Sequence, residues 1–313
     1  MKFLYLDQNF WIRLARVHYG FDTNQLIKKC CTKLQELVSN EKLLCPISIA
    51  NFSELHTVKD KEKSKRLGEF MFLLSKGYCM LPAQGKLLRW EVINAMLSEL
   101  RKPKLIEPNE LSQLVVAQGI FTLVGRSGTL KGDVPEETKK TILKKLNSAE
   151  MVNYFLTTPL DAKKDNEYSK TMEPLRQHMM KIKDKTRRHY ASYADYFTGV
   201  IVPILVDIEK YGWIFRQQFA SFDKGAMIAF LKKIPSAYCE MELSHGRNAD
   251  LGRPIKDNDL NDILGLSVAI PYCDIVAAER MFISIAKRAK LSELYETELV
   301  STFEELSICL DEI

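Results

Sequence analysis

The sequence contains no apolar run long enough to cross a membrane. Its most apolar internal stretch, GVIVPILV, is interrupted by Pro203 and ends at Asp207, whereas a membrane-spanning helix needs about 18 or more apolar residues. Asp7 interrupts the first apolar stretch after only a few residues, which is too short for the core of a signal peptide. We therefore expect a soluble, cytoplasmic protein without membrane contacts.

The cysteines, histidines and glycines follow none of the common functional spacings. The seven cysteines include no CxxC pair, so neither a disulfide framework nor a zinc site is indicated, and reduced thiols are expected. The five histidines form no HxxxH or HExxH pattern, which argues against a zinc hydrolase. The phosphate-binding patterns GxxxxGK[ST] and GxGxxG are also missing, which disfavours nucleoside-triphosphate and dinucleotide enzymes.

The charge balance is only mildly basic. The chain has 45 Lys and Arg against 40 Asp and Glu, a net charge of +5, which is compatible with a polyanionic partner without demonstrating one. Basic clusters lie at 59–66 and 181–190, and aromatic residues follow the second cluster. Arg187 and Arg188 are therefore candidates for nucleic-acid contacts. The alternative is a solvated helix face with the aromatic residues in a core stripe.

The first part of the chain alternates between strand and helix patterns. Expected strands at 2–6, 42–49 and 78–82 are separated by helical patterns at 23–40, 50–58 and 59–77. This rhythm is typical of an α/β fold with a parallel sheet.

Long helical patterns then dominate, with a glycine-rich turn at 125–133, before the alternation returns. Near the C-terminus we expect helices at 258–270 and 280–291 and strands at 274–278 and 297–301. The sequence therefore predicts one discontinuous α/β core, residues 1–84 plus 250–313, with a helical insertion at 85–249.

Several acidic residues lie where an expected strand ends or an expected helix begins. Asp7 closes the first strand, Glu54 lies one turn beyond the second, and Glu279 directly follows the strand at 274–278. The carboxyl ends of parallel strands share one edge of a sheet, the edge at which open α/β sheets place ligands. Asp262, at the start of a helix, can join this group.

Carboxylates gathered in this way repel one another unless cations lie among them. Oxygen ligands without histidine or cysteine favour Mg²⁺ or Mn²⁺ over zinc. Sites of this kind perform phosphoryl chemistry, in which one metal ion activates a water and a second stabilises the leaving oxygen.

Each acid also has a structural alternative. Asp7 can be a turn or capping residue, Glu54 a first-turn acid favoured by the helix dipole, and Asp259 with Asp262 a capping pair. A haloacid-dehalogenase-type phosphatase also begins with a strand that ends in Asp, but it needs a second Asp two residues later, where this chain has Asn9.

Other polar residues could support the carboxylates. Asn9, Ser48 and Asp259 could orient the carboxylates or the attacking water, although Asn and Ser also satisfy turn backbone. The segment SHGRNADLGRP reads as a loop beside the acidic segment, and we expect Arg247 in it to contact substrate.

Three segments together carry a family resemblance: LDQN after the first strand, PISIANFSEL, and NDLNDILGLSVAIPYCDIVAAERMF. They resemble the PIN-domain superfamily of metal-dependent ribonucleases, and the last segment is similar to the C-terminal signature of bacterial PIN-like proteins. The resemblance implies a PIN-like parallel-sheet core. It also implies metal binding by Asp7, Glu54, Asp262 and Glu279, with Asp274 as a fifth ligand or a structural acid. The superfamily's last acid is most often an Asp after a Thr, whereas here Glu279 follows Ala278.

The expected function is thus a Mg²⁺- or Mn²⁺-dependent nuclease, an endoribonuclease by the resemblance, and the family's habits suggest a toxin-like or defence effector. The alternative is a catalytically inactive PIN-like scaffold that binds nucleic acid or a partner protein. In either case the helical insertion is the expected place for a partner protein or a second copy of the chain.

Overall fold

The computed structural model describes residues 1–125, 135–158, 168–208, 223–250 and 252–313. The chain divides into two compact units. Unit 1 comprises Met1–Pro82, Ser112–Asp165 and Val268–Ile313, and unit 2 comprises Ala83–Leu111 and Asn166–Ser267. The predicted glycine-rich turn at 125–133 lies almost wholly outside the described residues.

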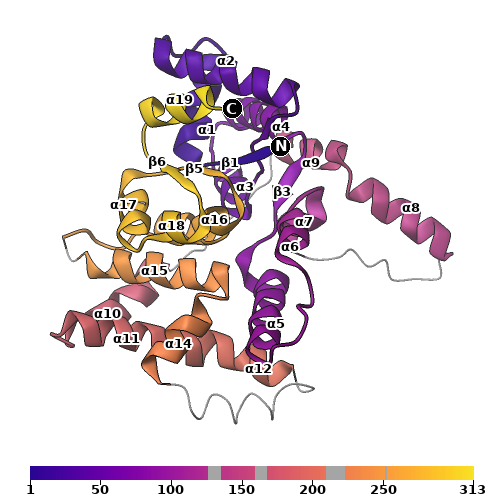
Figure 1. Ribbon diagram of the computed structural model, residues 1–313. Helices are drawn as coiled ribbons and strands as arrows, with labels where there is room; N and C mark the ends of the chain where they lie inside the picture. The colour runs from indigo at the N-terminus through magenta and orange to yellow at the C-terminus, as the bar shows by residue number, and fades with distance from the viewer. Residues whose placement is uncertain (126–134, 159–167, 209–222, 251) are drawn as a thin grey trace. The chain divides into compact units, whose positions relative to one another are not determined.

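Unit 1 is built on a four-stranded parallel sheet in the order β2-β1-β5-β6 (Figure 1). Strand β1 is central and pairs in register with both neighbours, Lys2 with Leu43 of β2 and Leu4 with Ile275 of β5. The fold is therefore mixed α/β with a parallel sheet, as the alternation of strand and helix patterns predicts. The strands of this sheet are β1 (Lys2–Leu6), β2 (Leu43–Leu44), β5 (Ile275–Ala277) and β6 (Glu298–Val300).

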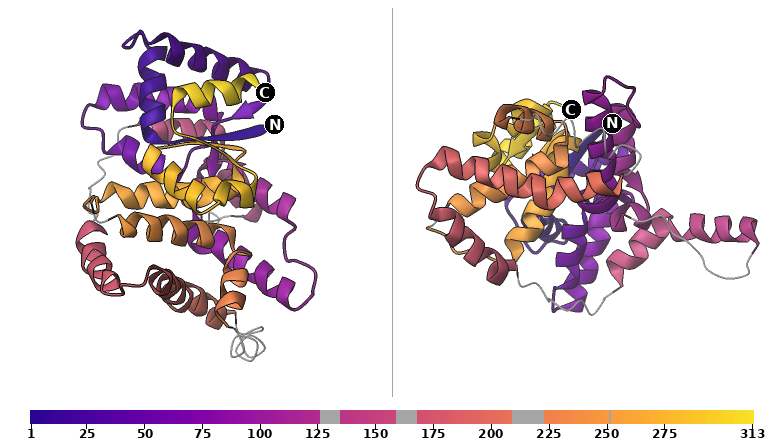
Figure 2. Two further views of the ribbon diagram at one scale, coloured as in Figure 1. Left: turned by 60° about the vertical axis from the view of Figure 1, so that its left-hand side comes forward. Right: turned by 90° about the horizontal axis from the view of Figure 1, so that it is seen from below.

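Helices cover both faces of this sheet, so its strands read as almost continuous apolar runs. Helices α1, α2 and α19 lie on one side and α17 and α18 on the other (Figures 1 and 2). Leu4, Leu6, Trp11 and Leu34 belong to the resulting core. The helices of unit 1 near the sheet are α1 (Gln8–His18), α2 (Gln25–Ser39), α3 (Ile49–His56), α4 (Lys61–Ser75), α17 (Arg280–Arg288), α18 (Leu291–Tyr295) and α19 (Phe303–Asp311).

The strand predicted at 42–49 is shorter than expected. Pro46 has no N–H to donate to a ladder, and regular pairing stops at Leu44. Beyond it, Ile47 forms a single parallel bridge to Cys79 in β3 (Tyr78–Met80). The main pairing of β3 is antiparallel, with β4 (Val116–Gln118) in a separate two-stranded sheet.

Part of the predicted insertion packs within unit 1. Besides β4, residues 112–165 contribute α7 (Ile120–Val124), α8 (Glu136–Leu146) and α9 (Ala149–Thr157). Helix α9 packs on α4, where Gly68 lies directly under the backbone carbonyl of Leu156. Residues 250–267, which were predicted to belong to the core, fall in unit 2.

Every described element that lies wholly in unit 2 is helical. Buried Glu91 of α5 accepts hydrogen bonds from the N–H and the hydroxyl of Ser236 in the first turn of α15, which satisfies backbone donors left open at a helix start. The helices are η1 (Ala83–Leu87), α5 (Leu88–Glu99), α10 (Tyr168–Met180), α11 (Lys185–Tyr196), η2 (Phe197–Ile201), α12 (Val202–Asp207), α14 (Lys224–Leu231) and α15 (Pro235–Ala249).

Two helices cross the division between the units, α6 (Pro108–Val115) and α16 (Asn258–Tyr272). Of the helices in the described part of the chain, none combines the length and apolar character needed to cross a membrane. All seven cysteines are free thiols, as predicted.

We expect Gly68→Ala to destabilise unit 1. A Cβ at this position would collide with the Leu156 carbonyl, and overpacking of this kind costs about 1–3 kcal/mol, more than the gain in helix propensity returns. Urea unfolding measures the change. Gly199→Ala is the control, because a Cβ there meets no atom within 4 Å. A Gly68→Ala protein at least as stable as the parent would contradict this packing.

Candidate functional site

The carboxyl end of β1 passes directly into α1 through Asp7. The Asp7 N–H continues the sheet by donating to Ala277 O at 2.9 Å. Its carboxylate caps α1, with Oδ1 accepting from Gln8 N at 2.7 Å. The side chain is buried, with only 7% of its surface exposed. The structure thus confirms the capping role of Asp7 and places its carboxylate at the carboxyl edge of the sheet.

Glu279 reaches the same edge from the neighbouring strand. Leu6 of β1 pairs with Ala277 of β5, so the residues that follow the two strands leave the sheet side by side. Glu279 occupies the cap position of α17, but its side chain makes no capping hydrogen bond there. Its backbone N–H donates to the Asp7 carboxylate, and its own charge acts on that group. The structure therefore brings together two acids from opposite ends of the chain.

Burial raises the pKa of Asp7 to about 6, from an ordinary value of 3.8. The hydrogen bond from the Gln8 N–H opposes this rise, while the nearby charge of Glu279 adds to it. A buried carboxylate with an acidic neighbour is costly to ionise unless a cation compensates the charge. The pair is therefore suited to bind a cation.

Helix α3 is attached to the same end of β1. Ser48 caps the helix by accepting from Asn51 N at 3.1 Å, and Asn51 Nδ2 donates to Leu6 O at 3.2 Å. Ser48 therefore satisfies local backbone, which was the structural alternative to its orienting a carboxylate or a water. Glu54 lies one helical turn beyond Asn51 and is half-buried. Its participation with Asp7 stays a prediction.

Gln8 was missed by the sequence analysis. Its side chain is only 7% exposed, and neither Oε1 nor Nε2 has a hydrogen-bond partner among the described residues. Unsatisfied buried amides are rare and call for an explanation. Helical spacing could have indicated its burial, because Gln8 stands three residues before buried Trp11 on α1. No helix was predicted at this position, however. Asn9, the other polar residue in this turn, is exposed.

Asp274 lies at the other edge of the sheet. It directly precedes β5, and its carboxylate accepts from Phe3 N at 2.7 Å, near the start of β1. Because β1 and β5 are parallel, a residue that precedes β5 lies at the opposite edge of the sheet from a residue that follows β1, such as Asp7. The prediction of Asp274 as a metal ligand beside Asp7 is therefore wrong, and its structural alternative holds.

Arg247 is a buried structural residue rather than a loop residue that faces substrate. It lies within α15 and is fully buried, and its Nε donates to Asp259 Oδ2 at 2.6 Å. Asp259 also accepts from Lys256 N at 2.9 Å and pairs with Arg253 at 3.5 Å, so hydrogen bonds and two ion pairs account for this buried carboxylate. The loop predicted at 244–254 is therefore wrong over its first half.

The remaining candidates also belong to unit 2. Asp262 lies in the part of α16 assigned to that unit, so its participation with Asp7 stays a prediction. Arg187 is exposed in the first turn of α11, whereas the Arg188 side chain donates to Ile182 O and Lys183 O. Nucleic-acid binding by either arginine stays a prediction.

Within the described residues, no three or more His, Cys, Asp and Glu side chains form a group suited to hold a metal ion. No family model, curated protein or solved structure matches this chain. The candidate site therefore rests on the geometry of unit 1 alone, with Asp7 and Glu279 at its centre.

We expect Asp7→Asn to stabilise the protein in the presence of a chelator. The folded state holds the Asp7 proton more tightly than the unfolded state, so wild-type stability falls as the pH rises from about 4 to about 7. Asn keeps the cap without this cost. The pKa of Asp7 is raised by about two, and a change of one in pKa corresponds to about 1.4 kcal/mol. The free energy of unfolding at pH 7 should therefore increase by at most about 3 kcal/mol. Urea unfolding from pH 4 to 8 tests this, and a difference that does not grow with pH would contradict it.

We also expect Gln8→Met to stabilise the protein by about 1–3 kcal/mol, because it removes an unsatisfied buried amide at nearly constant volume. Gln35→Met is the matched control. The Gln35 side chain is bonded to His18 Nδ1 at 2.8 Å, so that variant should gain nothing. Thermal unfolding of both variants measures the difference. A clear loss of stability in Gln8→Met would show that the amide is satisfied in solution.

Proposed function

We propose that the protein is a divalent-metal-dependent phosphodiester hydrolase with a PIN-like α/β core, acting on nucleic acid and most specifically as an endoribonuclease. The observation that carries the proposal is the pairing of buried Asp7 with Glu279 at the carboxyl edge of a parallel sheet. This is the edge at which open α/β sheets bind their ligands.

The donor set at this edge fits Mg²⁺ or Mn²⁺. It consists of carboxylate oxygens, and the neighbouring amide of Gln8 is an oxygen and nitrogen group that lacks a partner among the described residues. Mg²⁺ is commonly held by only one or two protein carboxylates and completes its shell with water and substrate phosphate. When bound, such an ion lowers the pKa of a coordinated water and neutralises charge on the phosphate.

The protein's own groups have distinct roles in this proposal. Asp7 and Glu279 hold the cation. The Asn51 amide, bonded to Leu6 O, fixes α3 against the end of β1 and so sets where Glu54 can reach. Backbone donors at Gln8 and Glu279 keep the Asp7 carboxylate oriented. We assign the buried Gln8 amide, which lacks a partner among the described residues, the role of donating to a phosphate oxygen or a water.

The test compares Asp7→Asn and Glu279→Gln with Asp60→Asn. Asp60 is the matched control because it caps α4 in the same unit without belonging to the pair. With single-stranded RNA and Mn²⁺, we expect each site variant to lose more than about 100-fold in cleavage rate, since even residues that only support metal ligands cost about 10–100-fold. Asp60→Asn should retain its activity.

Thermal unfolding with Mn²⁺ supplies a readout besides activity. A ligand at about 100 times its Kd stabilises the folded state by about 2.7 kcal/mol, and this gain should vanish in Asp7→Asn. Stabilisation that depends on Asp7 without any cleavage of RNA or DNA would identify a metal-binding scaffold instead of a nuclease. Equal cleavage by Asp7→Asn and wild type would reject the proposal.

A further inference from the structure

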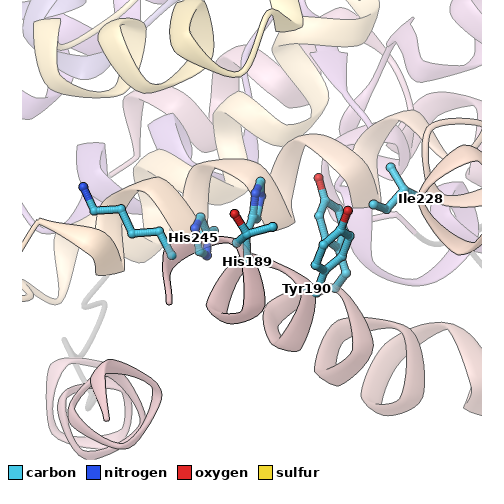
Figure 3. Close-up of a pocket in the computed structure, with 7 residues that line it drawn as sticks. His189, Tyr190, Ile228 and His245 are labelled. Carbon is cyan, nitrogen blue, oxygen red and sulfur yellow. The ribbon is translucent and has the colours of Figure 1, made fainter. Parts of the chain in front are cut away.

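Unit 2 contains a cavity of about 330 Å³ that the proposed hydrolase chemistry does not use (Figure 3). It is formed by α11, α14 and α15. The volume lies near the lower end of the range for small-molecule sites, which restricts an occupant to about the size of one nucleotide. The lining residues are Lys185, Thr186, His189, Tyr190, Tyr193, Ile228 and His245.

One wall of the cavity is a column of stacked rings. His189 lies between His245, with ring centroids 4.1 Å apart, and Tyr193, at 4.7 Å. Figure 3 shows the two imidazoles side by side, His189 on α11 and His245 on α15. Tyr193 stacks in turn on Tyr238. Each ring of the column therefore packs against at least one neighbouring ring.

Buried Glu242, which is not among the lining residues, forms hydrogen bonds to two rings of this column. It accepts from the Tyr193 hydroxyl and bonds to His189 Nε2 at 3.2 Å. The His245 Nδ1 is bonded to Ser192 Oγ at 3.0 Å. Among the described residues, these bonds involve neither His189 Nδ1 nor His245 Nε2. Burial lowers the pKa of His245 to about 4, so this ring contributes stacking surface and no positive charge.

The accessible part of the lining is cationic and aromatic. The His189 side chain is 35% exposed and Tyr190 is half-buried, unlike the buried Tyr193. Lys185 lines the cavity directly, and Lys224 Nζ lies 5.0 Å from the Tyr190 ring centroid. Tyr193 thus belongs to a buried core stripe, which was the alternative to nucleic-acid contact for these aromatic residues. His189 and Tyr190 are partly exposed and can be reached by a ligand.

We propose that this cavity binds a nucleotide, in which a nucleobase packs against the Tyr190 ring and its phosphate is held by Lys185 and His189. Aromatic rings bind any base through its π-face, and basic side chains beside them attract the phosphate. The ligand can be a free mononucleotide or one nucleotide of a single strand, since both carry the same base and phosphate. This site requires no metal and is independent of the Asp7–Glu279 pair.

The test titrates the full-length protein in EDTA with AMP and UMP, with adenosine and inorganic phosphate as partial ligands, and with a labelled RNA of about ten nucleotides. We expect the mononucleotides to bind more tightly than either partial ligand. Tyr190→Ala should weaken binding about tenfold or more. Lys185→Glu should do the same, and because Lys185 is exposed this variant keeps its fold even if Tyr190→Ala does not.

Matched controls separate the site from general effects. Tyr154→Ala removes an aromatic ring that is 56% exposed in unit 1, and Lys61→Glu changes a lysine at the first position of α4, as Lys185 is of α11. Both should bind like wild type. If binding of the RNA depends on Tyr190 and Lys185, the ligand is a nucleotide within a single strand. If only the binding of mononucleotides depends on them, the ligand is a free nucleotide. No binding up to about 1 mM, or binding unaffected by both variants, would overturn the proposal, whatever the outcome of the cleavage assays.

Discussion

The parallel pairing of β1 with β5 is the constraint on which the rest of unit 1 depends. It joins the first strand of the chain to one near its C-terminus, with Leu4, Tyr5 and Leu6 opposite Ile275, Val276 and Ala277. A slip of one residue would turn each apolar side chain toward the wrong helical layer. The same register fixes where the chain leaves the sheet, and therefore places Asp7 and Glu279 just beyond the ends of two paired strands.

This geometry has an electrostatic consequence. An acid at the start of a helix gains from the helix dipole and from backbone N–H groups, and the bonds to Asp7 are of this kind. The gain does not offset burial, since the pKa of Asp7 remains raised. A residue that served only as a cap would be expected to lie nearer to solvent, as Asp60 does. The combination of burial, an acidic neighbour and an unsatisfied amide at Gln8 is what sets this end of the sheet apart.

Much of the fold could be predicted from local patterns. The strands at β1, β3, β5 and β6 and the helix α2, with its Asn24 cap, fall where apolar periodicity and capping residues place them. Helix α1 was missed because Gln8 and Asn9 resemble a turn and the first turn contains no acid. The partner of β3 was missed because antiparallel pairing with β4 depends on contacts distant in sequence, which no local pattern encodes.

The candidate site was predictable only in part. Asp7 and Glu279 could be predicted because residues that follow parallel strands lie at one edge of the sheet. Asp274 precedes its strand, so the same rule would have placed it at the opposite edge. Arg247 could not be recognised as buried, because Gly246 and Asn248 beside it are typical of a loop and its partner Asp259 lies on another helix. The cavity in unit 2 depends on three helices that meet, so its aromatic residues looked like an ordinary core stripe.

The proposed function depends on a divalent cation held by Asp7 and Glu279 together. The most direct measurement is an anomalous difference map from crystals of the full-length protein grown with Mn²⁺. We expect a peak at the carboxyl edge of the sheet, within about 2.0–2.6 Å of carboxylate oxygens from both residues. A well-ordered site with no such peak at saturating Mn²⁺, or a peak bound elsewhere in the chain, would contradict it.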